Sequence, residues 1–212
     1  MTPYYQDSAV TIYHGDCREI LPLLSTHETI ITDPVWPNAS VRLFGHDDPS
    51  AMMRAMWGSL AVVPQRAAIH LGCDSDPRFL LTTPETLPFF RVAWLEIVRM
   101  GYKGRLGMTG DVGYLFGTPP ASRPGSHIIP GRCTDADPKG RQSRHPCPRK
   151  LKHVQWLVRW WSDLNDMILD PFAGSCTTAL AAKGLNRKCV CIEIEERFCE
   201  MGARRLSQEV LL

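Results

Sequence analysis

The residues that most clearly suggest a chemical role lie in a small-residue turn in the C-terminal part of the sequence. An apolar run, 167–169, is followed by Asp170-Pro171-Phe172-Ala173-Gly174-Ser175, and an alanine-rich helix is expected to begin near Thr177. A buried strand, a tight glycine turn and a helix N-terminus form a nucleotide-type pocket at the carboxyl edge of a sheet. Asp170 could merely cap the turn, but its place before Pro-Phe-x-Gly favours a ligand site.

Another apolar run follows that helix and ends in an acid. Residues 189–192, Cys-Val-Cys-Ile, precede Glu193. A carboxylate at this place suits a ribose, because it accepts hydrogen bonds from both sugar hydroxyls. We therefore expect Glu193 to bind a ribose, although a surface acid at a strand end would give the same pattern.

A comparable acidic turn lies far upstream. The apolar stretch 29–32 ends in Asp33-Pro34-Val35-Trp36, followed by Pro37 and Asn38. An aspartate in isolation would be an ordinary turn residue. Beside a proline and an aromatic ring, and with the other motif present, Asp33 is the strongest candidate for catalysis.

Together these motifs resemble those of the beta group of amino DNA methyltransferases, which methylate adenine N6 or cytosine N4. Asp33–Trp36 resembles their Asp-Pro-Pro-Tyr motif, and Asp170–Ser175 resembles the Asp-Pro-Phe-x-Gly-Ser-Gly motif that binds S-adenosylmethionine. The stretch 145–150 resembles their His-Pro-x-x-Lys-Pro motif, and His-Gly-Asp-Cys at 14–17 resembles their first strand and helix. The catalytic motif precedes the cofactor motif, which is the circularly permuted order of that group.

The resemblance implies S-adenosylmethionine as cofactor, DNA as substrate and restriction-modification as a setting. It implies that the Asp33 carboxylate and the Pro34 carbonyl accept the two protons of an exocyclic amine, while Trp36 stacks on the flipped base. An acid at position 33 favours adenine N6, because the cytosine-N4 enzymes more often carry serine there. The residues implied to hold the cofactor are Asp16, Asp170, Phe172, Ala173, Gly174, Ser175, Thr177, Glu193 and Lys150.

The chain departs from the family motifs at three places. Val35 replaces the second proline, which loosens the turn that aims the Pro34 carbonyl. Cys176 replaces the last glycine of the cofactor motif. Its Cβ and sulfur bring bulk close to the cofactor and penalise a positive φ, so we expect either a slightly different turn or a reduced cofactor affinity. Arg149 and Lys150 replace Lys-Pro, and either cation is a candidate contact for the cofactor carboxylate.

Several other functions fit parts of the pattern. Cytosine N4 is the alternative target in DNA, and an RNA base or a protein amide is an alternative outside DNA. Enzymes that methylate protein glutamine carry an Asn-Pro-Pro-Tyr motif and place the cofactor motif before it. The opposite order in this chain argues against that function. A homologue that binds cofactor and DNA but has weakened catalysis is a third class, given Val35 and Cys176.

The alternation of apolar runs and helical patterns predicts an α/β fold. We expect a single methyltransferase domain, 1–212, with a Rossmann-like, mostly parallel sheet and one antiparallel edge strand. The apolar spacing predicts a helix over 87–101. Two short strands, 105–108 and 112–116, are expected to flank a turn at 109–111.

Positive charge is concentrated in one part of the sequence. Residues 101–160 hold eleven Lys and Arg against three acids, a net charge of +8; since the whole chain carries +2, the remainder carries −6. A basic segment on an otherwise acidic protein predicts a DNA footprint. The loops 37–50 and 117–148 are the candidate DNA contacts. Because both are short, we expect relaxed sequence specificity or recognition shared across a homodimer.

The remaining composition is ordinary. No run approaches the ~18 apolar residues of a membrane span, and the N-terminus lacks a signal-peptide pattern, so the expected location is cytoplasmic. The eight cysteines include no Cys-x-x-Cys pair. A zinc site from His127, Cys133, His145 and Cys147 fits no standard spacing, so we expect no metal.

Overall fold

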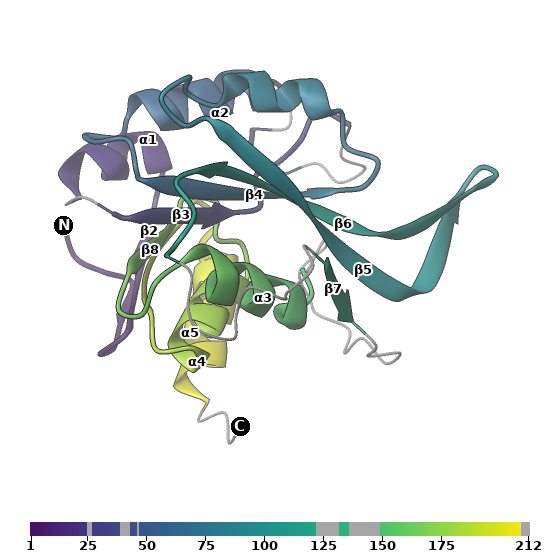
Figure 1. Cartoon of the computed structure of the whole chain (residues 1–212). Coiled ribbons are helices and arrows are strands. Elements are labelled where there is room, and N and C mark those ends of the chain that lie inside the picture. Colours follow the sequence, from purple (N-terminus) through teal and green to yellow (C-terminus); the bar gives the residue numbers. More distant parts are fainter. Residues whose placement is uncertain (25–26, 39–42, 46, 122–131, 136–148, 209–212) are drawn as a thin grey trace.

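The computed structural model describes residues 1–24, 27–38, 43–45, 47–121, 132–135 and 149–208. Within these ranges the strands form one sheet in the order β1-β2-β9-β8-β3-β4-β6-β5-β7 (Figure 1). They are β1 (Tyr5–Gln6), β2 (Val10–His14), β3 (Thr29–Thr32), β4 (Arg66–Gly72), β5 (Phe89–Lys103), β6 (Leu106–Gly117), β7 (Arg132–Asp135), β8 (Met167–Asp170) and β9 (Lys188–Glu193).

The middle of the sheet, β2-β9-β8-β3-β4, is entirely parallel. Antiparallel pairing is confined to its two sides, where β1 pairs with β2 and β6 lies between β4 and β5. The predicted α/β fold with a mostly parallel sheet is therefore confirmed. The first strands of the chain lie beside the last ones, as the permuted motif order requires.

Helices cover both faces of the sheet (Figure 1). The helices are α1 (Cys17–Ile20), α2 (Pro49–Gly58), α3 (Leu151–Trp161), α4 (Thr177–Gly184) and α5 (Glu196–Ser207), with short 3-10 segments at Leu21–Leu23 and Pro77–Thr82. Within the described ranges, none of these helices has the length and apolar character that crossing a membrane requires.

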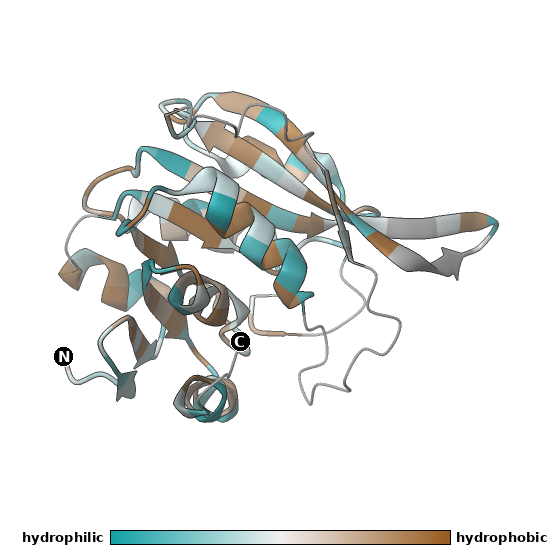
Figure 2. Ribbon diagram, turned by 60° about the horizontal axis from the view of Figure 1, so that its bottom comes forward, coloured by the Kyte–Doolittle hydropathy of each residue, from teal (hydrophilic) through white to brown (hydrophobic). Residues whose placement is uncertain are grey.

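Alternate residues of each central strand face opposite helical layers. Ile30 packs in a cluster with Met53 and Met56 of α2, whereas Ile31 packs in a second cluster with Leu157 of α3. This period of two is the geometry of a strand buried on both faces. Figure 2 shows the same arrangement as apolar strands between the two helical layers. The apolar runs of the sequence are continuous because both faces are covered.

The predicted helix over 87–101 is wrong, since these residues lie almost wholly in β5. Ala93 and Leu95 are buried while Trp94 between them is 56% exposed, which is the alternation of a strand. Residues 106–108 and 112–116 belong to the single strand β6, so the turn predicted at 109–111 is also wrong. The β5–β6 turn lies at Gly104, whose φ of +63° suits glycine.

The β5–β6 hairpin extends beyond the neighbouring strand. The pairing of β4 with β6 ends at Gly72 and Asp111, while β6 pairs with β5 as far as Leu106 and Lys103. The tip of the hairpin therefore projects past the carboxyl end of β4, as Figure 1 shows. Asp111 lies at its base, where β6 leaves the sheet.

Candidate active site

The strand order brings the carboxyl ends of five strands into one row. Asp16 lies just after β2, Glu193 ends β9, Asp170 ends β8, Asp33 follows β3 and His70 lies near the end of β4. The chain runs from β8 outward to β9, and from β3 outward to β4, so the direction of winding reverses between β8 and β3. Such a switch point leaves a crevice at the carboxyl edge, where open α/β sheets bind ligands.

An open cavity of about 1210 Å³ occupies this crevice, counting the space that is continuous with solvent. It is lined by every residue predicted for the site except Lys150: Asp16, Asp33, Pro34, Trp36, Asp170, Phe172, Ala173, Gly174, Ser175, Thr177 and Glu193. The structure therefore places the two distant motifs on one cavity. Lys150 instead precedes the first residue of α3, as its N-cap.

Two buried carboxylates hold the glycine turn in place. Asp170 accepts hydrogen bonds from Thr32 Oγ1 (2.7 Å) and from the Phe172 backbone N–H (3.2 Å). Glu193 accepts from the backbone N–H groups of Gly174 (2.7 Å) and Glu195 (2.8 Å), one on each oxygen. Burial raises the pKa of Asp170 to about 6, and burial also raises the pKa of Glu193. Each Glu193 oxygen keeps acceptor capacity on the cavity side.

Asp16 lies at the β2 end of the row of strands and has a structural contact of its own. Its carboxylate caps α1 by accepting from the backbone N–H of Arg18 (2.9 Å), and it also accepts from the Arg18 guanidinium Nε (2.9 Å). The same residue lines the cavity. Asp16 therefore caps α1 and lines the cavity at the same time.

Cys176 adopts the left-handed backbone conformation that glycine tolerates best, with φ of +58°. Its side chain is fully buried and does not line the cavity, so the expected bulk close to the cofactor is not found there. The thiol instead faces α5, where a Cβ on Gly202 would overlap its Sγ. The substitution moves bulk into the core and leaves the cavity open.

The sequence did not reveal the partner of Asp33. Arg149 forms a two-pronged ion pair with it, from Nε to Oδ2 and from Nη2 to Oδ1, both 2.6 Å. The third nitrogen, Nη1, lies 3.0 Å from Oδ2 of Asp111. The guanidinium also lies over the Trp36 ring, 4.7 Å from its centroid. Of the two cations that replace Lys-Pro, Arg149 is the one at the cavity, and it binds a carboxylate of the protein.

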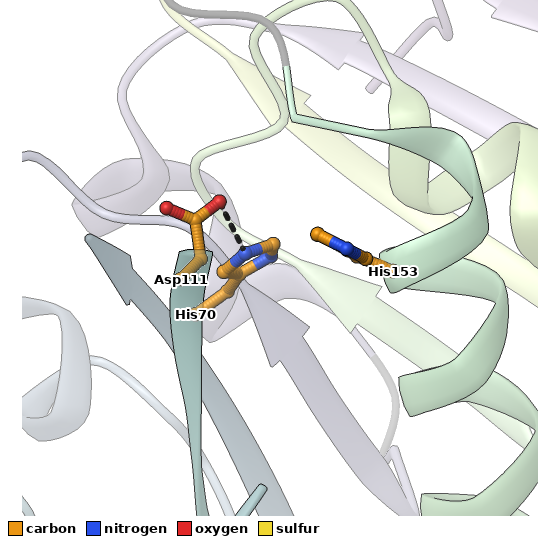
Figure 3. A group of neighbouring side chains, drawn as sticks. All are labelled: His70, Asp111 and His153. Atoms are coloured by element: carbon orange, nitrogen blue, oxygen red, sulfur yellow. Dashed lines mark hydrogen bonds and ion pairs between the residues drawn. The ribbon is translucent and has the colours of Figure 1, made fainter. Parts of the chain in front are cut away.

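Asp111 in turn belongs to a buried cluster with His70 and His153 (Figure 3). His70 Nε2 donates to Asp111 Oδ2 (3.2 Å), and His153 Nε2 donates to the backbone carbonyl of Glu96 (3.0 Å). Burial opposes the ionisation of Asp111, but the hydrogen bond from His70 and the charge of Arg149 outweigh it and hold its pKa well below the ordinary value. The guanidinium beside Asp111 would repel a metal cation, so we interpret the cluster as an anchor for Arg149.

Much of the predicted DNA-contacting surface lies outside the described residues. Leu43 and Phe44, from the loop 37–50, line the cavity. Most of the loop 117–148 is not described, and it includes Lys139, Arg141 and Arg144 of the basic segment. Three of the residues weighed for zinc, His127, His145 and Cys147, also fall there, while Cys133 is buried on β7.

The sequence model of a family described as DNA methylase (N6_N4_Mtase) matches residues 89–204, which is more than half of the chain. The chain belongs to this DNA methylase family. The match covers the glycine turn that follows β8 and the helix α3 that follows Arg149.

Curated relatives of this DNA methylase match over a shorter segment. The orphan methyltransferase M.BamHII of Bacillus amyloliquefaciens is 38% identical over 71 residues, which are 32% of this chain and 26% of the relative. The DNA adenine methyltransferase YhdJ of Escherichia coli (strain K12) is 39% identical over 62 residues, or 29% of this chain and 21% of the relative. The matched segment thus spans about a quarter of these relatives.

Solved structures match this DNA methylase over nearly its whole length. The crystal structure of an M1.HpyAVI–SAM complex gives a TM-score of 0.74 at 21% identity, covering 93% of this chain and 99% of the other. The cytosine-N4-specific PvuII DNA methyltransferase gives 0.72 at 16% identity, covering 99% and 90%. At these identities the likeness establishes the shared fold.

Proposed function

We propose that this chain transfers a methyl group from S-adenosylmethionine to the exocyclic amine of a flipped base in DNA, with adenine N6 as the preferred target. The observation that carries the proposal is a single cavity that holds both the Asp33 turn and the Gly174 turn. Family membership supports the reaction class. The cavity supports the assignment of one turn to the base and the other to the cofactor.

The residues of the cofactor half suit S-adenosylmethionine. Glu193 retains acceptor capacity for two ribose hydroxyls, while its bonds to Gly174 and Glu195 fix its orientation. Asp16 offers an acceptor at the far end, and Phe172 and Phe198 supply apolar wall. When bound, the cofactor supplies a methyl carbon that is made electrophilic by a positively charged sulfur.

The base half supplies what an aromatic amine needs to react. The lone pair of such an amine is delocalised into its ring, so the nitrogen is a poor nucleophile. Two acceptors on its two protons favour the pyramidal form and orient the lone pair. We assign these roles to the Asp33 carboxylate and the Pro34 carbonyl, and we assign stacking of the base to Trp36. The proton leaves after methylation, so Asp33 acts as an acceptor and need not be a full general base.

The preference for adenine rests on residue 33. Relatives and structural neighbours include both an adenine enzyme and a cytosine-N4 enzyme, so the family alone leaves the base open. An aspartate at this position favours adenine, as a tendency of the resembled group. Contact with DNA is assigned to the basic segment and to the loops 37–50 and 117–148, with a homodimer as the arrangement that would enlarge this surface.

The test is mass spectrometry of nucleosides from DNA incubated with the protein and S-adenosylmethionine. We expect N6-methyladenine; N4-methylcytosine instead would change the target base, and methylation of RNA alone would change the substrate.

Asp33→Asn should lower methylation at least ~100-fold, because it replaces a charged acceptor by a neutral one, while cofactor affinity stays within about twofold. Glu200→Gln is the matched control, since Glu200 is exposed and pairs with Arg204 on α5.

Cofactor binding separates the main alternatives. Loss of S-adenosylmethionine binding in Asp33→Asn would contradict the assignment of this turn to the base. Binding of the cofactor by the natural chain without transfer to any nucleic acid would identify a homologue that has lost catalysis, and Val35 would then be the first position to restore to proline.

A further inference from the structure

Arg149 occupies the place that the proposed reaction assigns to the target base. Its guanidinium is planar, donates two N–H groups to the Asp33 carboxylate and lies 4.7 Å from the centre of the Trp36 ring. The amine edge of a flipped base would need the same carboxylate, and its ring would need the same aromatic face. Arginine and base therefore compete for one position.

A second acid is placed to receive the arginine. Nη1 of Arg149 already lies 3.0 Å from Asp111 while Nε and Nη2 bind Asp33. Asp111 is fixed by its hydrogen bond from His70, and its low pKa keeps it ionised. The Arg149 side chain is only 9% exposed, so a guanidinium that leaves Asp33 still needs a buried anionic partner. Asp111 meets that need without a large movement of the side chain.

We propose that Arg149 is a positioning residue that substitutes for the base in the resting site and transfers from Asp33 to Asp111 when the base enters. The inference rests on the proposed function, because it assumes that Asp33 and Trp36 receive a base. In the resting state the arginine keeps the partly buried Asp33 charge paired. On base entry the amine replaces it at Asp33, and the Arg149–Asp111 pair remains.

The exchange lowers the apparent affinity for the base. A base binds only to molecules in which Arg149 has left Asp33, so the apparent dissociation constant rises as that fraction falls. If about a tenth of the molecules are in the open state, binding is weakened about tenfold. Asp111 sets this fraction, because it is the alternative partner of the arginine.

The experiment measures binding of deoxyadenosine and deoxycytidine by NMR titration, together with kcat and KM for DNA. Arg149→Met keeps the length of the side chain and removes its donors, and we expect it to tighten nucleoside binding about tenfold. KM for DNA should fall with it, and the effect on KM should exceed the effect on kcat, because Arg149 has already left Asp33 when the base is bound. Arg204→Met is the matched control, since Arg204 is exposed on α5 and lies outside the basic segment.

Asp111→Asn tests the second partner. It should weaken nucleoside binding in the natural background, because Arg149 then remains on Asp33, and it should have no effect in the Arg149→Met background. Unchanged or weaker nucleoside binding in Arg149→Met would overturn the proposal, as would equal effects of Asp111→Asn in both backgrounds.

If the Arg149→Met variant does not fold, a second measurement uses the natural protein. The Arg149 Nε–H resonance, assigned by its absence in Arg149→Lys, must shift on saturation with nucleoside; no shift overturns the proposal.

Failure of the proposed function is a separate result. Loss of S-adenosylmethionine binding, or absence of methyl transfer by the natural chain, would contradict the proposed function. Normal cofactor binding and normal methylation, combined with no gain of nucleoside affinity in Arg149→Met, would contradict only the exchange of Arg149.

Discussion

Four carboxylates at the carboxyl edge of the sheet are stabilised in two different ways. Asp33 and Asp111 share the guanidinium of Arg149. Asp170 and Glu193 lack such a cation among their hydrogen-bond partners in the described residues, and they are bound by backbone N–H groups and a threonine hydroxyl. Charge on Asp170 and Glu193 is therefore costly, and this cost depends on pH.

Asp170→Asn should stabilise the protein at neutral pH. Burial raises the pKa of Asp170 from 3.8 to about 6, so the folded state holds a proton more tightly than the unfolded state does. Stability from this group is full below pH 4 and is lost as the pH rises toward 6, a loss of about 3 kcal/mol at pH 7. The amide oxygen of asparagine can still accept from Thr32 and Phe172. We expect a gain of about 1–3 kcal/mol at pH 8 and none at pH 4.

Urea unfolding of both proteins at the two pH values measures this difference. Thr32→Val serves as a control, because it removes a donor to Asp170 without removing the titrating group. A gain of equal size at pH 4 and pH 8 would show that ionisation of Asp170 is not its source.

At the scale of elements, α4 begins after a residue that normally would be glycine. Cys176 bears a positive φ, which costs a non-glycine residue about 1 kcal/mol or more. Its thiol is accommodated because α5 presents Gly202 opposite it. The start of α4 therefore depends on a pair of residues: Cys176 in the turn, and Gly202 on α5, whose small size leaves room for the thiol.

Exchanging the two side chains tests this pairing. Gly202→Ala alone should destabilise the protein by about 2–4 kcal/mol, because its Cβ overlaps the Cys176 thiol. Cys176→Gly should lose the packing of the thiol but relieve the strained backbone. The double variant should recover most of the loss of Gly202→Ala, giving a coupling energy of at least 1 kcal/mol in thermal or urea unfolding. Additive effects would contradict direct packing of the two residues.

The elements that sequence patterns predicted well are the parallel strands that carry the site. Their short apolar runs end in Asp, Glu or Gly, which marks both the strand and its carboxyl end. The error fell on β5, where Trp94 is exposed beside buried Ala93 and Leu95. Its apolar residues also fit a helical spacing, and only the aromatic and β-branched content favoured a strand. The partners of Arg149 could not be predicted, because Asp33 follows β3 and Asp111 lies in β6, far apart in the sequence.

At the scale of the whole molecule, the site forms where the two halves of the sheet join. Strands β8 and β3 pair directly, through Thr29 with Ile168 and Ile30 with Leu169. At the carboxyl edge, the Thr32–Asp170 hydrogen bond (2.7 Å) links the ends of β3 and β8. Arg66, the first residue of β4, forms ion pairs with Asp163 (3.2 Å) and Asp166 (3.4 Å). The separation of the Asp33 and Gly174 turns is thus set by the strand pairing that also holds the fold together.

Positive and negative charge are unevenly distributed along the chain. The +8 of residues 101–160 lies on a chain whose remainder carries −6. A charge distribution of this kind attracts a polyanion through the basic segment, and the bound phosphates release counterions. The affinity for DNA should therefore fall steeply as salt increases, with the basic segment responsible for most of the slope.

Replacing Lys139, Arg141 and Arg144 together by alanine should weaken DNA binding and flatten its salt dependence. Each lost phosphate contact reduces the slope of log K against log salt by about 0.9, so three contacts would reduce it by roughly 3. The control replaces three exposed cations outside the segment, Arg54, Lys188 and Arg204, which removes the same charge from elsewhere. Fluorescence anisotropy with labelled duplex DNA at several salt concentrations gives both slopes. An equal decrease for the two variants would mean that net charge, and not the basic segment, governs binding, and the DNA path would then have to be placed over another face of the molecule.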